Sequence, residues 1–397
     1  MIGLTKLVTG RTSPSDRYRY SEKSQLNKRD QVHRFVDKTG FHPVVVWNIT
    51  QSCNLECAHC YYSAVLGKDP ETLSIETIFK IVDDFAKAKV PVVLLSGGEP
   101  LLRKDLLEIA LYISSKGINP VLSTNGTLIK SVEQARELKE HGINYVGISI
   151  DGLEERHNLQ RKKRGFFDRT FNGIKSSRGG VLRFSMRFTV TAANIDDLPE
   201  VLDLASELKV QRFCMYHLVP SGRGKRYGDI SDTQRRELIW SLCDQAKNRD
   251  FEILTVDSPA DGPLIHQWAL ENAPELADGI LEKLRSQGSD GTGKRIVEID
   301  HNGDVHPNQF WLGKTIGNVV ETPFNEIFNP ADSGTLDPLL QDLRQEPWSL
   351  EGNCATCTYK SLCGGFRARA LNMEGSLWAS DPTCTLNEIE REALVSV

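Results

Sequence analysis

The sequence predicts an α/β fold built on a parallel sheet, and two features of the chain support this prediction. Short apolar runs recur between residues 43 and 218, and amphipathic stretches of helical period separate them. Six strand–helix units in series favour a parallel sheet with right-handed crossovers. A partial barrel and a doubly wound sheet both suit this pattern, and periodicity alone does not choose between them. In either fold, ligands bind at the carboxyl ends of the strands.

The individual elements follow from local patterns. Residues 43–49 (PVVVWNI) form the first expected strand. Ser74 is the expected N-cap of the next helix, in which Ile78, Val82 and Phe85 share one apolar face. A further helix is expected around residues 106–113, and further strands at residues 92–95, 121–123, 145–150, 183–190 and 212–218.

The pattern changes after residue 220. A helix is expected over residues 231–248, a flexible glycine-rich turn at 288–293, and a hairpin at 296–306. Asn302-Gly303 indicates a type I′ turn for that hairpin. We therefore divide the chain into an N-terminal arm (1–40), a barrel or sheet domain (41–230) and a C-terminal extension (231–397).

Composition excludes several classes of protein. The net charge is −5 over 397 residues, so a general nucleic-acid surface is not expected. No apolar run approaches the length of a membrane span, and residues 1–40 lack the apolar core of a signal peptide. We therefore expect a cytoplasmic protein without a membrane partner.

The nine cysteines fall into two groups. Cys53, Cys57 and Cys60 lie directly after the first expected strand, and four more lie near the C-terminus. A reducing cytosol makes structural disulfides improbable, so metal binding or catalysis is the better interpretation. Cys214 and Cys243 stand alone and are expected to be small buried hydrophobic residues.

The Cys53-x3-Cys57-x2-Cys60 triad is typical of an iron–sulfur cluster. Such clusters are held by thiolates, normally four, so three cysteines leave one iron open to a small molecule. A zinc site or a disulfide loop is the alternative for a triad alone. Ser96-Gly97-Gly98-Glu99-Pro100 ends the second strand, where glycines allow close approach of backbone to a ligand.

Together, this triad and this GGEP segment resemble the signature of the radical S-adenosylmethionine (SAM) enzymes. The resemblance implies a partial (β/α)6 barrel, a [4Fe–4S] cluster on the triad, and SAM bound at the open iron. SAM is then cleaved to a deoxyadenosyl radical, which carries the chemistry. The resemblance also implies an electron donor such as flavodoxin or ferredoxin.

The same resemblance implies which residues contact SAM. His59 occupies a position that is usually aromatic in the family, and we assign it no catalytic role. Arg187 is expected to pair with the SAM carboxylate, because guanidinium binds carboxylate bidentately; an ordinary strand-end ion pair is the alternative. The expected cofactor-binding residues are Gly97, Gly98, Glu99, Pro100, Asn125, Ser149, Asp151 and Arg187.

The C-terminal cysteines are Cys354, Cys357, Cys363 and Cys384. Four thiols suit either a closed [4Fe–4S] cluster or a structural zinc. After a radical SAM core, they resemble the auxiliary-cluster extension called SPASM or twitch, which favours iron–sulfur. Asn308 stands where a full SPASM domain has a cysteine after its hairpin, so we expect one auxiliary cluster and not two.

Residues 354–384, 43–48 and 306–311 resemble the tetrapyrrole branch of the superfamily. Residues 1–7 and 13–20 most resemble the branch member that removes two acetate side chains from an iron tetrapyrrole derived from siroheme. The alternatives are a haem d1 branch enzyme on the same substrate, a peptide-modifying SPASM enzyme, and a non-catalytic zinc or iron–sulfur scaffold.

An iron tetrapyrrole carries several carboxylates, so an acidic protein must offer local cations. Tyr216 and His217, at the end of the sixth strand, are candidates for a catalytic acid or a haem ligand; a packed core pair is the alternative. The candidate substrate contacts are Arg17, Arg19, Arg223, Lys225, Arg226, His306, Arg367 and Arg369, each of which is alternatively a surface residue.

Overall fold

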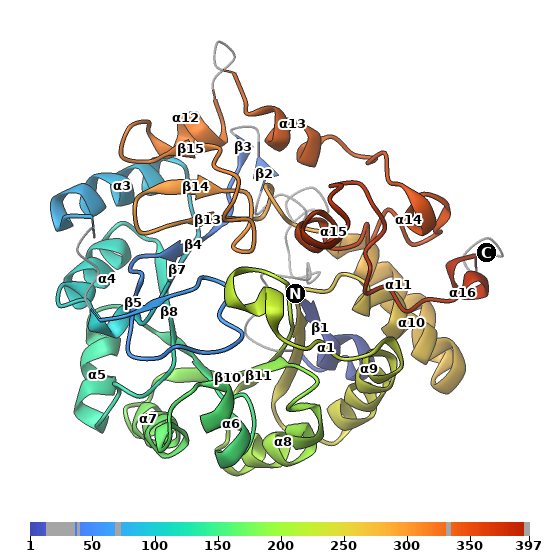
Figure 1. Ribbon diagram of the computed structural model, residues 1–397, viewed down its shortest axis with the longest axis horizontal. Coiled ribbons are helices and arrows are strands. Elements are labelled where there is room, and N and C mark those ends of the chain that lie inside the picture. Colours follow the sequence, from blue (N-terminus) through green and yellow to red (C-terminus); the bar gives the residue numbers. More distant parts are fainter. Residues whose placement is uncertain (13–35, 38–39, 68–72, 331–334, 393–397) are drawn as a thin grey trace.

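A curved, open sheet of eleven strands organises the chain (Figure 1). The computed structural model describes residues 1–12, 36–37, 40–67, 73–330 and 335–392. The strand order is β1-β12-β11-β10-β9-β8-β7-β4-β13-β14-β15. No strand joins β1 to β15 in this order, so the barrel is partial.

The six strands expected from the sequence form the centre of this sheet, and all of them run parallel. They are β4 (Val44–Asn48), β7 (Val92–Ser96), β8 (Asn119–Thr124), β9 (Tyr145–Ser149), β10 (Arg183–Val190) and β11 (Arg212–His217). The parallel prediction is confirmed, and the curvature of the sheet, with helices on its convex face (Figure 1), fits the partial barrel and not a doubly wound sheet, which has helices on both faces.

Helices cover the convex face of the sheet, as Figure 1 shows. They are α3 (Ile75–Lys87), α4 (Leu106–Ser115), α5 (Val132–Glu140), α6 (Glu154–Gln160), α7 (Phe166–Gly179), α8 (Leu198–Glu207) and α9 (Asp232–Lys247). Ser74 caps α3 by accepting a bond from the Thr77 N–H, and Ile78, Val82 and Phe85 are buried as expected. Ser231 and Gln234 form a capping box at the start of α9.

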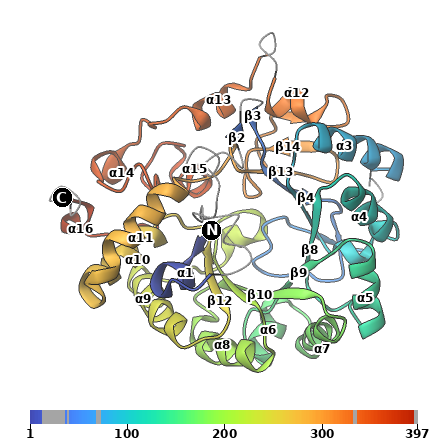
Figure 2. The ribbon, with the colours of Figure 1, turned by 180° about the vertical axis from the view of Figure 1, so that it is seen from behind.

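The sheet continues beyond β11 with two strands that were not expected from the sequence. β12 (Glu252–Val256) pairs in parallel with β11, and β1 (Ile2–Gly3) pairs antiparallel with β12. Helix α1 (Leu4–Thr9) packs beside β12 (Figure 2). Helices α10 (Asp261–Asn272) and α11 (Pro274–Gln287) complete this side. Ile2, Leu4, Leu7 and Val8 therefore belong to the hydrophobic core, although the sequence placed them in a polar arm.

On the other edge, β13 (Ile296–Ile299) pairs in parallel with β4 and antiparallel with β14 (Asp304–His306), followed by β15 (Gly317–Asn318). The hairpin is confirmed, but its turn is not type I′. Only Gly303 has a positive φ (90°), and its N–H bonds back to the Asp300 carbonyl. This is a type I geometry followed by a left-handed glycine, because a type I′ turn needs positive φ at both central positions.

The remaining elements are short. They are β2 (Val36–Asp37), β3 (Gly40–Phe41), β5 (Ser52–Cys53), β6 (Val65–Leu66), η2 (Pro100–Leu102), η3 (Ile195–Asp197), η4 (Gly222–Arg226), α12 (Phe324–Phe328), α13 (Pro338–Arg344), α14 (Gly352–Thr356), α15 (Arg367–Glu374) and α16 (Glu388–Glu392). Strands from all three expected segments share the large sheet, so residues 40 and 230 do not separate independent sheets. Over the described residues, no helix is both long and apolar enough to cross a membrane.

Candidate functional site

The three N-terminal cysteines lie on the loop that follows β4, which we call the cysteine loop (residues 49–66). Cys53 and Cys57 are buried and Cys60 is partly buried, in a cluster with Leu55 and Phe166. All three thiols are free. Burial, helped by the charges of Glu99 and the other two cysteines, raises the pKa of Cys53 to about 12. Thiols gathered in such a place become thiolates only beside positive charge, which a bound metal centre supplies.

Gly97 and Gly98 hold the cysteine loop against the end of β7. The Gly98 N–H bonds the Thr50 carbonyl at 2.7 Å, and the Glu99 N–H bonds the Ser52 carbonyl at 2.8 Å. A Cβ on Gly98 would lie 2.0 Å from the Ser52 carbonyl oxygen. Both glycines also line the main cavity. Their small size is therefore needed for backbone packing as well as for the expected approach of a ligand.

Glu99 ties together the ends of two neighbouring strands. Its carboxylate accepts from the Thr124 hydroxyl (2.7 Å), the Asn125 N–H (2.9 Å) and the Leu101 N–H. Burial raises its pKa, and these three bonds oppose that rise. Neither Glu99 nor Pro100, which begins η2, lines the main cavity. The structure gives both residues a part in shaping the strand ends.

Asn125 and Ser149 line the main cavity, as expected of cofactor contacts. The Asn125 amide donates to Asn54 Oδ1 at 2.7 Å, which links β8 to the cysteine loop. Asp151 differs, because it is fully buried and does not line the cavity. The structure therefore does not support Asp151 as a direct contact of SAM.

Asp151 instead holds the guanidinium of Arg161, which faces Cys57 of the triad. Its carboxylate pairs with Arg161 and lies 3.5 Å from His59 Nε2. Arg161 Nη1 in turn donates to Cys57 Sγ at 3.4 Å. Burial raises the pKa of Cys57, and the Arg161 charge opposes this rise. Arg161 was missed from the sequence, where it stands in an ordinary basic run of residues 161–164.

Arg187 is a partly buried cation in the wall of the main cavity. Its Nη1 donates to Ser123 Oγ at 2.5 Å, and its guanidinium covers Gly147, where a Cβ would lie 2.0 Å from Arg187 Nε. The Arg187 Nε is buried without a hydrogen-bond partner. Among the described residues it forms no ion pair with a carboxylate. An anionic ligand would supply the missing partner.

One cavity of about 1000 Å³ connects these residues with the far side of the barrel. That volume lies at the upper end of the usual range for small-molecule sites, roughly 300–1,000 Å³. Of the expected cofactor and cluster residues, it is lined by Cys53, Cys57, Cys60, Gly97, Gly98, Asn125, Ser149 and Arg187. It is also lined by cations that were not singled out from the sequence: Arg161, Arg212, Arg285, Lys294, Arg295 and Arg344.

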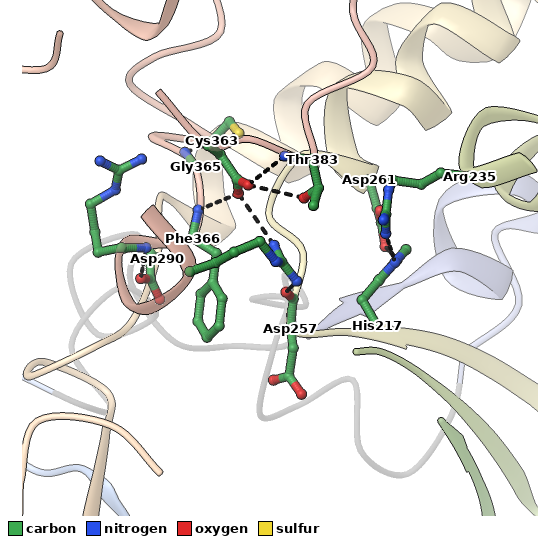
Figure 3. Close-up of polar contacts among 12 residues, drawn as sticks. His217, Arg235, Asp257, Asp261, Asp290, Cys363, Gly365, Phe366 and Thr383 are labelled. Atoms are coloured by element: carbon green, nitrogen blue, oxygen red, sulfur yellow. Dashed lines mark hydrogen bonds and ion pairs between the residues drawn. The ribbon is translucent and has the colours of Figure 1, made fainter. Parts of the chain in front are cut away.

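Tyr216 and His217 both line this cavity. His217 is held on both sides, by Arg235 Nη1 at its Nδ1 (2.7 Å) and by Asp261 Oδ2 at its Nε2 (2.9 Å), as Figure 3 shows. Arginine only donates, so Nδ1 accepts and the proton lies on Nε2. Neither ring nitrogen is free for a haem iron, and the structure does not support that role for His217.

Among the candidate substrate cations, Arg223 lines the main cavity. Its guanidinium also donates to the carbonyls of Cys57 (2.9 Å) and Ala64 (2.8 Å), so it holds the cysteine loop in place. Lys225 and Arg226 are exposed, and Lys225 lines a separate cavity of about 570 Å³. Arg17 and Arg19 lie outside the described residues.

The other three candidates do not line the main cavity. Arg367 and Arg369 are completely buried: Arg367 donates to two carbonyls of residues 377–379, and Arg369 bonds Asp381. His306 is buried, with Nδ1 on the Lys314 carbonyl and Nε2 3.7 Å from Glu298. The structure does not bring these three residues to the main cavity, because their side chains are buried inside the fold.

The four C-terminal thiols lie close enough to affect one another electrostatically. Burial raises the pKa of Cys384 to about 12, and Cys354 and Cys357 add to the rise. Burial together with Cys384 and Cys354 raises the pKa of Cys363. The Gly365 N–H donates to Cys363 Sγ at 3.3 Å, an environment that suits a thiolate ligand.

Asp381 fastens the two segments that carry Cys363 and Cys384. Its carboxylate accepts from the Phe366 N–H (2.7 Å) and from the Thr383 N–H and hydroxyl. Figure 3 labels these two partners, Phe366 and Thr383. Across the described ranges, no three His, Cys, Asp or Glu side chains are grouped as they would be around a single metal ion. The fit of a metal centre at either cysteine group therefore rests on its free, gathered thiols.

A family model described as the radical SAM superfamily matches residues 47–205. The chain is 38% identical to Fe-coproporphyrin III synthase of Methanosarcina barkeri, and the match covers 98% of both chains. The chain belongs to the radical SAM superfamily and is an enzyme of that class. Membership implies SAM and a [4Fe–4S] cluster.

Other relatives and structures agree with this assignment. Pre-heme d1 synthase of Dinoroseobacter shibae is 37% identical over 88% of this chain and 87% of its own length. The structure of anSMEcpe with bound AdoMet matches 88% of this chain and 96% of its own, with a TM-score of 0.66 and 19% identity. Streptococcus suis SuiB bound to S-adenosylmethionine has a TM-score of 0.64 at 18% identity, over 87% and 78% of the two chains. These two structures support the fold.

Proposed function

We propose that this radical SAM enzyme acts in haem biosynthesis and removes two acetate side chains from 12,18-didecarboxysiroheme to give Fe-coproporphyrin III. The observation that carries the proposal is the 38% identity to Fe-coproporphyrin III synthase over 98% of both chains. Pre-heme d1 synthase matches less of the chain, 88%, at 37% identity. The resemblance of residues 1–7, which form β1 and begin α1, supports the same choice.

In this proposal Cys53, Cys57 and Cys60 hold the [4Fe–4S] cluster. When both are bound, the cluster supplies the electron that cleaves SAM to a deoxyadenosyl radical. Gly97 and Gly98 shape the wall beside the cysteine loop, and Asn125 and Ser149 offer hydrogen-bonding groups from two neighbouring strand ends. Arg187, a partly buried cation whose buried Nε has no hydrogen-bond partner, suits the carboxylate of SAM.

We also propose a single auxiliary [4Fe–4S] cluster on Cys354, Cys357, Cys363 and Cys384. Asn308 is buried and does not replace a thiol, because its amide donates to Thr292 Oγ1 at 3.0 Å and accepts from the Phe310 N–H. That side chain fastens the 288–293 turn to the segment after the hairpin. No cysteine beyond the four is available nearby in the sequence for a further cluster.

The substrate of the proposed reaction is a polycarboxylate, and the cavity wall is rich in cations. Arg344 is a suitable partner because its side chain carries no ion pair with a carboxylate among the described residues. It donates to the carbonyls of Gly293 (3.0 Å) and Phe328 (2.7 Å), and its Nη2 is buried without a partner. Burial lowers the pKa of Arg344 to about 10, which leaves it charged at neutral pH.

The test is anaerobic turnover of the iron–sulfur-loaded enzyme with SAM, a reductant and 12,18-didecarboxysiroheme, followed by mass spectrometry. Flavodoxin or ferredoxin serves as the electron donor in a parallel reaction. A product that has lost two acetate groups and matches Fe-coproporphyrin III supports the proposal. Pre-haem d1 as the product would overturn it in favour of the relative reaction, and modification of a peptide but not of the tetrapyrrole would overturn it altogether.

A further inference from the structure

Asp257 lies at the carboxyl end of β12, at the edge of the sheet where parallel strands carry functional residues. It lines the same cavity as the cysteine triad. In Figure 3 its carboxylate points away from Thr383 and from the cysteine-bearing segment above it. The strand that places it there was not expected from the sequence, so Asp257 was not a candidate.

The backbone at Asp257 adopts a conformation that L residues rarely take. Its φ is +65°, in the left-handed region. Arg369 Nη2 donates to the Asp257 carbonyl at 2.8 Å, and Arg369 is itself anchored on Asp381 at 3.4 Å. The fold thus holds a strained residue at the cavity wall, and strain of this kind gathers at functional sites.

The carboxylate of Asp257 lacks a hydrogen-bond partner on its buried side. Its Oδ2 is buried without a hydrogen-bond partner. Among the described residues, no cation lies within ion-pair distance of it. Asp290, on the neighbouring 288–293 turn, contrasts with it, because its carboxylate accepts from Thr292 and from the Arg367 N–H. Burial without donors favours the neutral form of a carboxyl group.

Charged groups from every neighbouring element act on Asp257. Burial raises its pKa most; the Met1 amine, Arg369 of α15 and Arg187 of β10 oppose the rise, and Asp290 adds to it. The resulting pKa is about 7. Tyr216 of β11 also faces it, and burial keeps the phenol of Tyr216 neutral by raising its pKa.

We propose that Asp257 binds the substrate as a neutral carboxylic acid, donating a hydrogen bond to one of the carboxylates of the tetrapyrrole. This inference rests on the proposed function, which makes the substrate a polycarboxylate. An ionised Asp257 would repel such a ligand, whereas a protonated one supplies the donor that a carboxylate oxygen accepts. Asp257 therefore serves as a binding residue that depends on pH.

The experiment measures binding of iron coproporphyrin III to the cluster-loaded enzyme by absorbance titration between pH 6 and 8. We expect the affinity of the wild-type enzyme to fall about tenfold over this range as Asp257 loses its proton. Asp257→Asn cannot ionise and still donates, and asparagine tolerates left-handed backbone. This variant should bind at pH 8 about as tightly as the wild type does at pH 6, with no fall attributable to Asp257.

Asp278→Asn is the matched control, because Asp278 is an exposed carboxylate on α11. It should keep the wild-type pH dependence. Should Asp257→Asn fail to load iron, Asp257→Gly relieves the backbone strain and also removes the carboxyl group. The Gly variant should bind weakly and without the fall between pH 6 and 8.

Two negative results are distinguishable. A wild-type enzyme that binds the porphyrin, together with an Asp257→Asn or Asp257→Gly variant that keeps the full pH dependence, overturns the inference and leaves the proposed function standing. A wild-type enzyme that binds SAM but no tetrapyrrole at any pH overturns the proposed function, and this inference with it.

Discussion

Arg161 is the residue whose charge acts most directly on the triad. It donates to Cys57 Sγ at 3.4 Å and forms an ion pair with the Asp151 carboxylate. A hydrogen bond to a ligand sulfur stabilises negative charge on the cluster and so raises its reduction potential. In the proposed enzyme, in which Cys57 holds the cluster, Arg161 is therefore a positioning residue that acts on the electrostatics of the cluster.

Arg161→Gln should lower the reduction potential of the triad cluster. A charge-assisted hydrogen bond contributes about 1.5 kcal/mol, which for a one-electron couple corresponds to roughly 60 mV. Potentiometric titration followed by electron paramagnetic resonance measures this shift. Arg161→Lys is the informative partner, because it keeps the charge and loses the fork that bonds sulfur and Asp151 together. An unchanged reduction potential in Arg161→Gln would show that the hydrogen bond from Arg161 to Cys57 does not affect the cluster's potential.

At this scale the sequence predicts best where the chemistry is local. The triad, the GGEP segment and Ser149 were singled out because they follow expected strands and resemble a family signature, and all but Glu99 and Pro100 line the main cavity. Arg161 and Asp257 were not found, because their partners lie far away in sequence. The residue that Arg161 bonds is 104 positions distant, and Asp257 is held by a residue 112 positions distant.

At the scale of elements, the end of β7 and the cysteine loop form one packed unit. Gly98→Ala would place a Cβ 2.0 Å from the Ser52 carbonyl oxygen, which is backbone and cannot rotate away. We expect a loss of about 1–3 kcal/mol in the free energy of unfolding and reduced iron content, since the cysteine loop must shift. Gly313→Ala, with nothing within 4 Å of its Cβ, should leave both quantities unchanged. Equal iron loading in the two variants would contradict this packing argument.

The β13–β14 hairpin contains a completely buried carboxyl group, Glu298. Its Oε1 accepts from Asn48 Nδ2 at 2.6 Å, and burial raises its pKa well above the ordinary value. The folded chain thus keeps a proton that the unfolded chain releases above about pH 4.5, so this group lowers stability as the pH rises. The neighbouring His306 bonds the Lys314 carbonyl through Nδ1, and its Nε2 lies 3.7 Å from Glu298 Oε2.

Glu298→Gln should remove this penalty. Glutamine keeps the acceptor for Asn48 and remains neutral, so the variant should be more stable than the wild type at pH 8 and close to it at pH 5. Anaerobic denaturant unfolding at the two pH values measures the difference. A variant that loses stability equally at both would indicate that Glu298 is ionised in the folded chain.

Elements were predicted well where apolar period and length agree, as in β10, whose expected and observed bounds both span residues 183–190. β12 is a five-residue strand between two helices, and its apolar run EILTV is too short to be told from a buried helical segment. The type I′ turn was wrong because Asp300 competes for the turn, bonding the N–H groups of Asn302 and Asp304. Side-chain bonds of this kind override the preference of an Asn-Gly pair.

For the whole molecule, the continuous sheet is what links the two cysteine groups. β13 from the C-terminal part pairs with β4, directly before the cysteine loop, and α15 sends Arg369 to the end of β12. The expected boundaries missed this, because strand pairing between residues 44–47 and 296–299 leaves no local mark in the sequence. The cavity therefore has walls from both ends of the chain.

Because the two cysteine groups lie on separate segments of the chain, substitutions can remove the iron of one group and leave that of the other. Cys357→Ser combined with Cys384→Ser should lower iron from about eight to about four atoms per chain, because each [4Fe–4S] cluster holds four. The remaining cluster should still change its paramagnetic resonance spectrum when SAM is added, since Cys53, Cys57 and Cys60 are intact. Cys243→Ala, which removes a buried core thiol of neither group, is the control and should keep all the iron. Suppose that the wild type contains zinc and about four iron atoms, and that the double variant retains those four. This result would overturn the auxiliary cluster and leave the triad assignment intact.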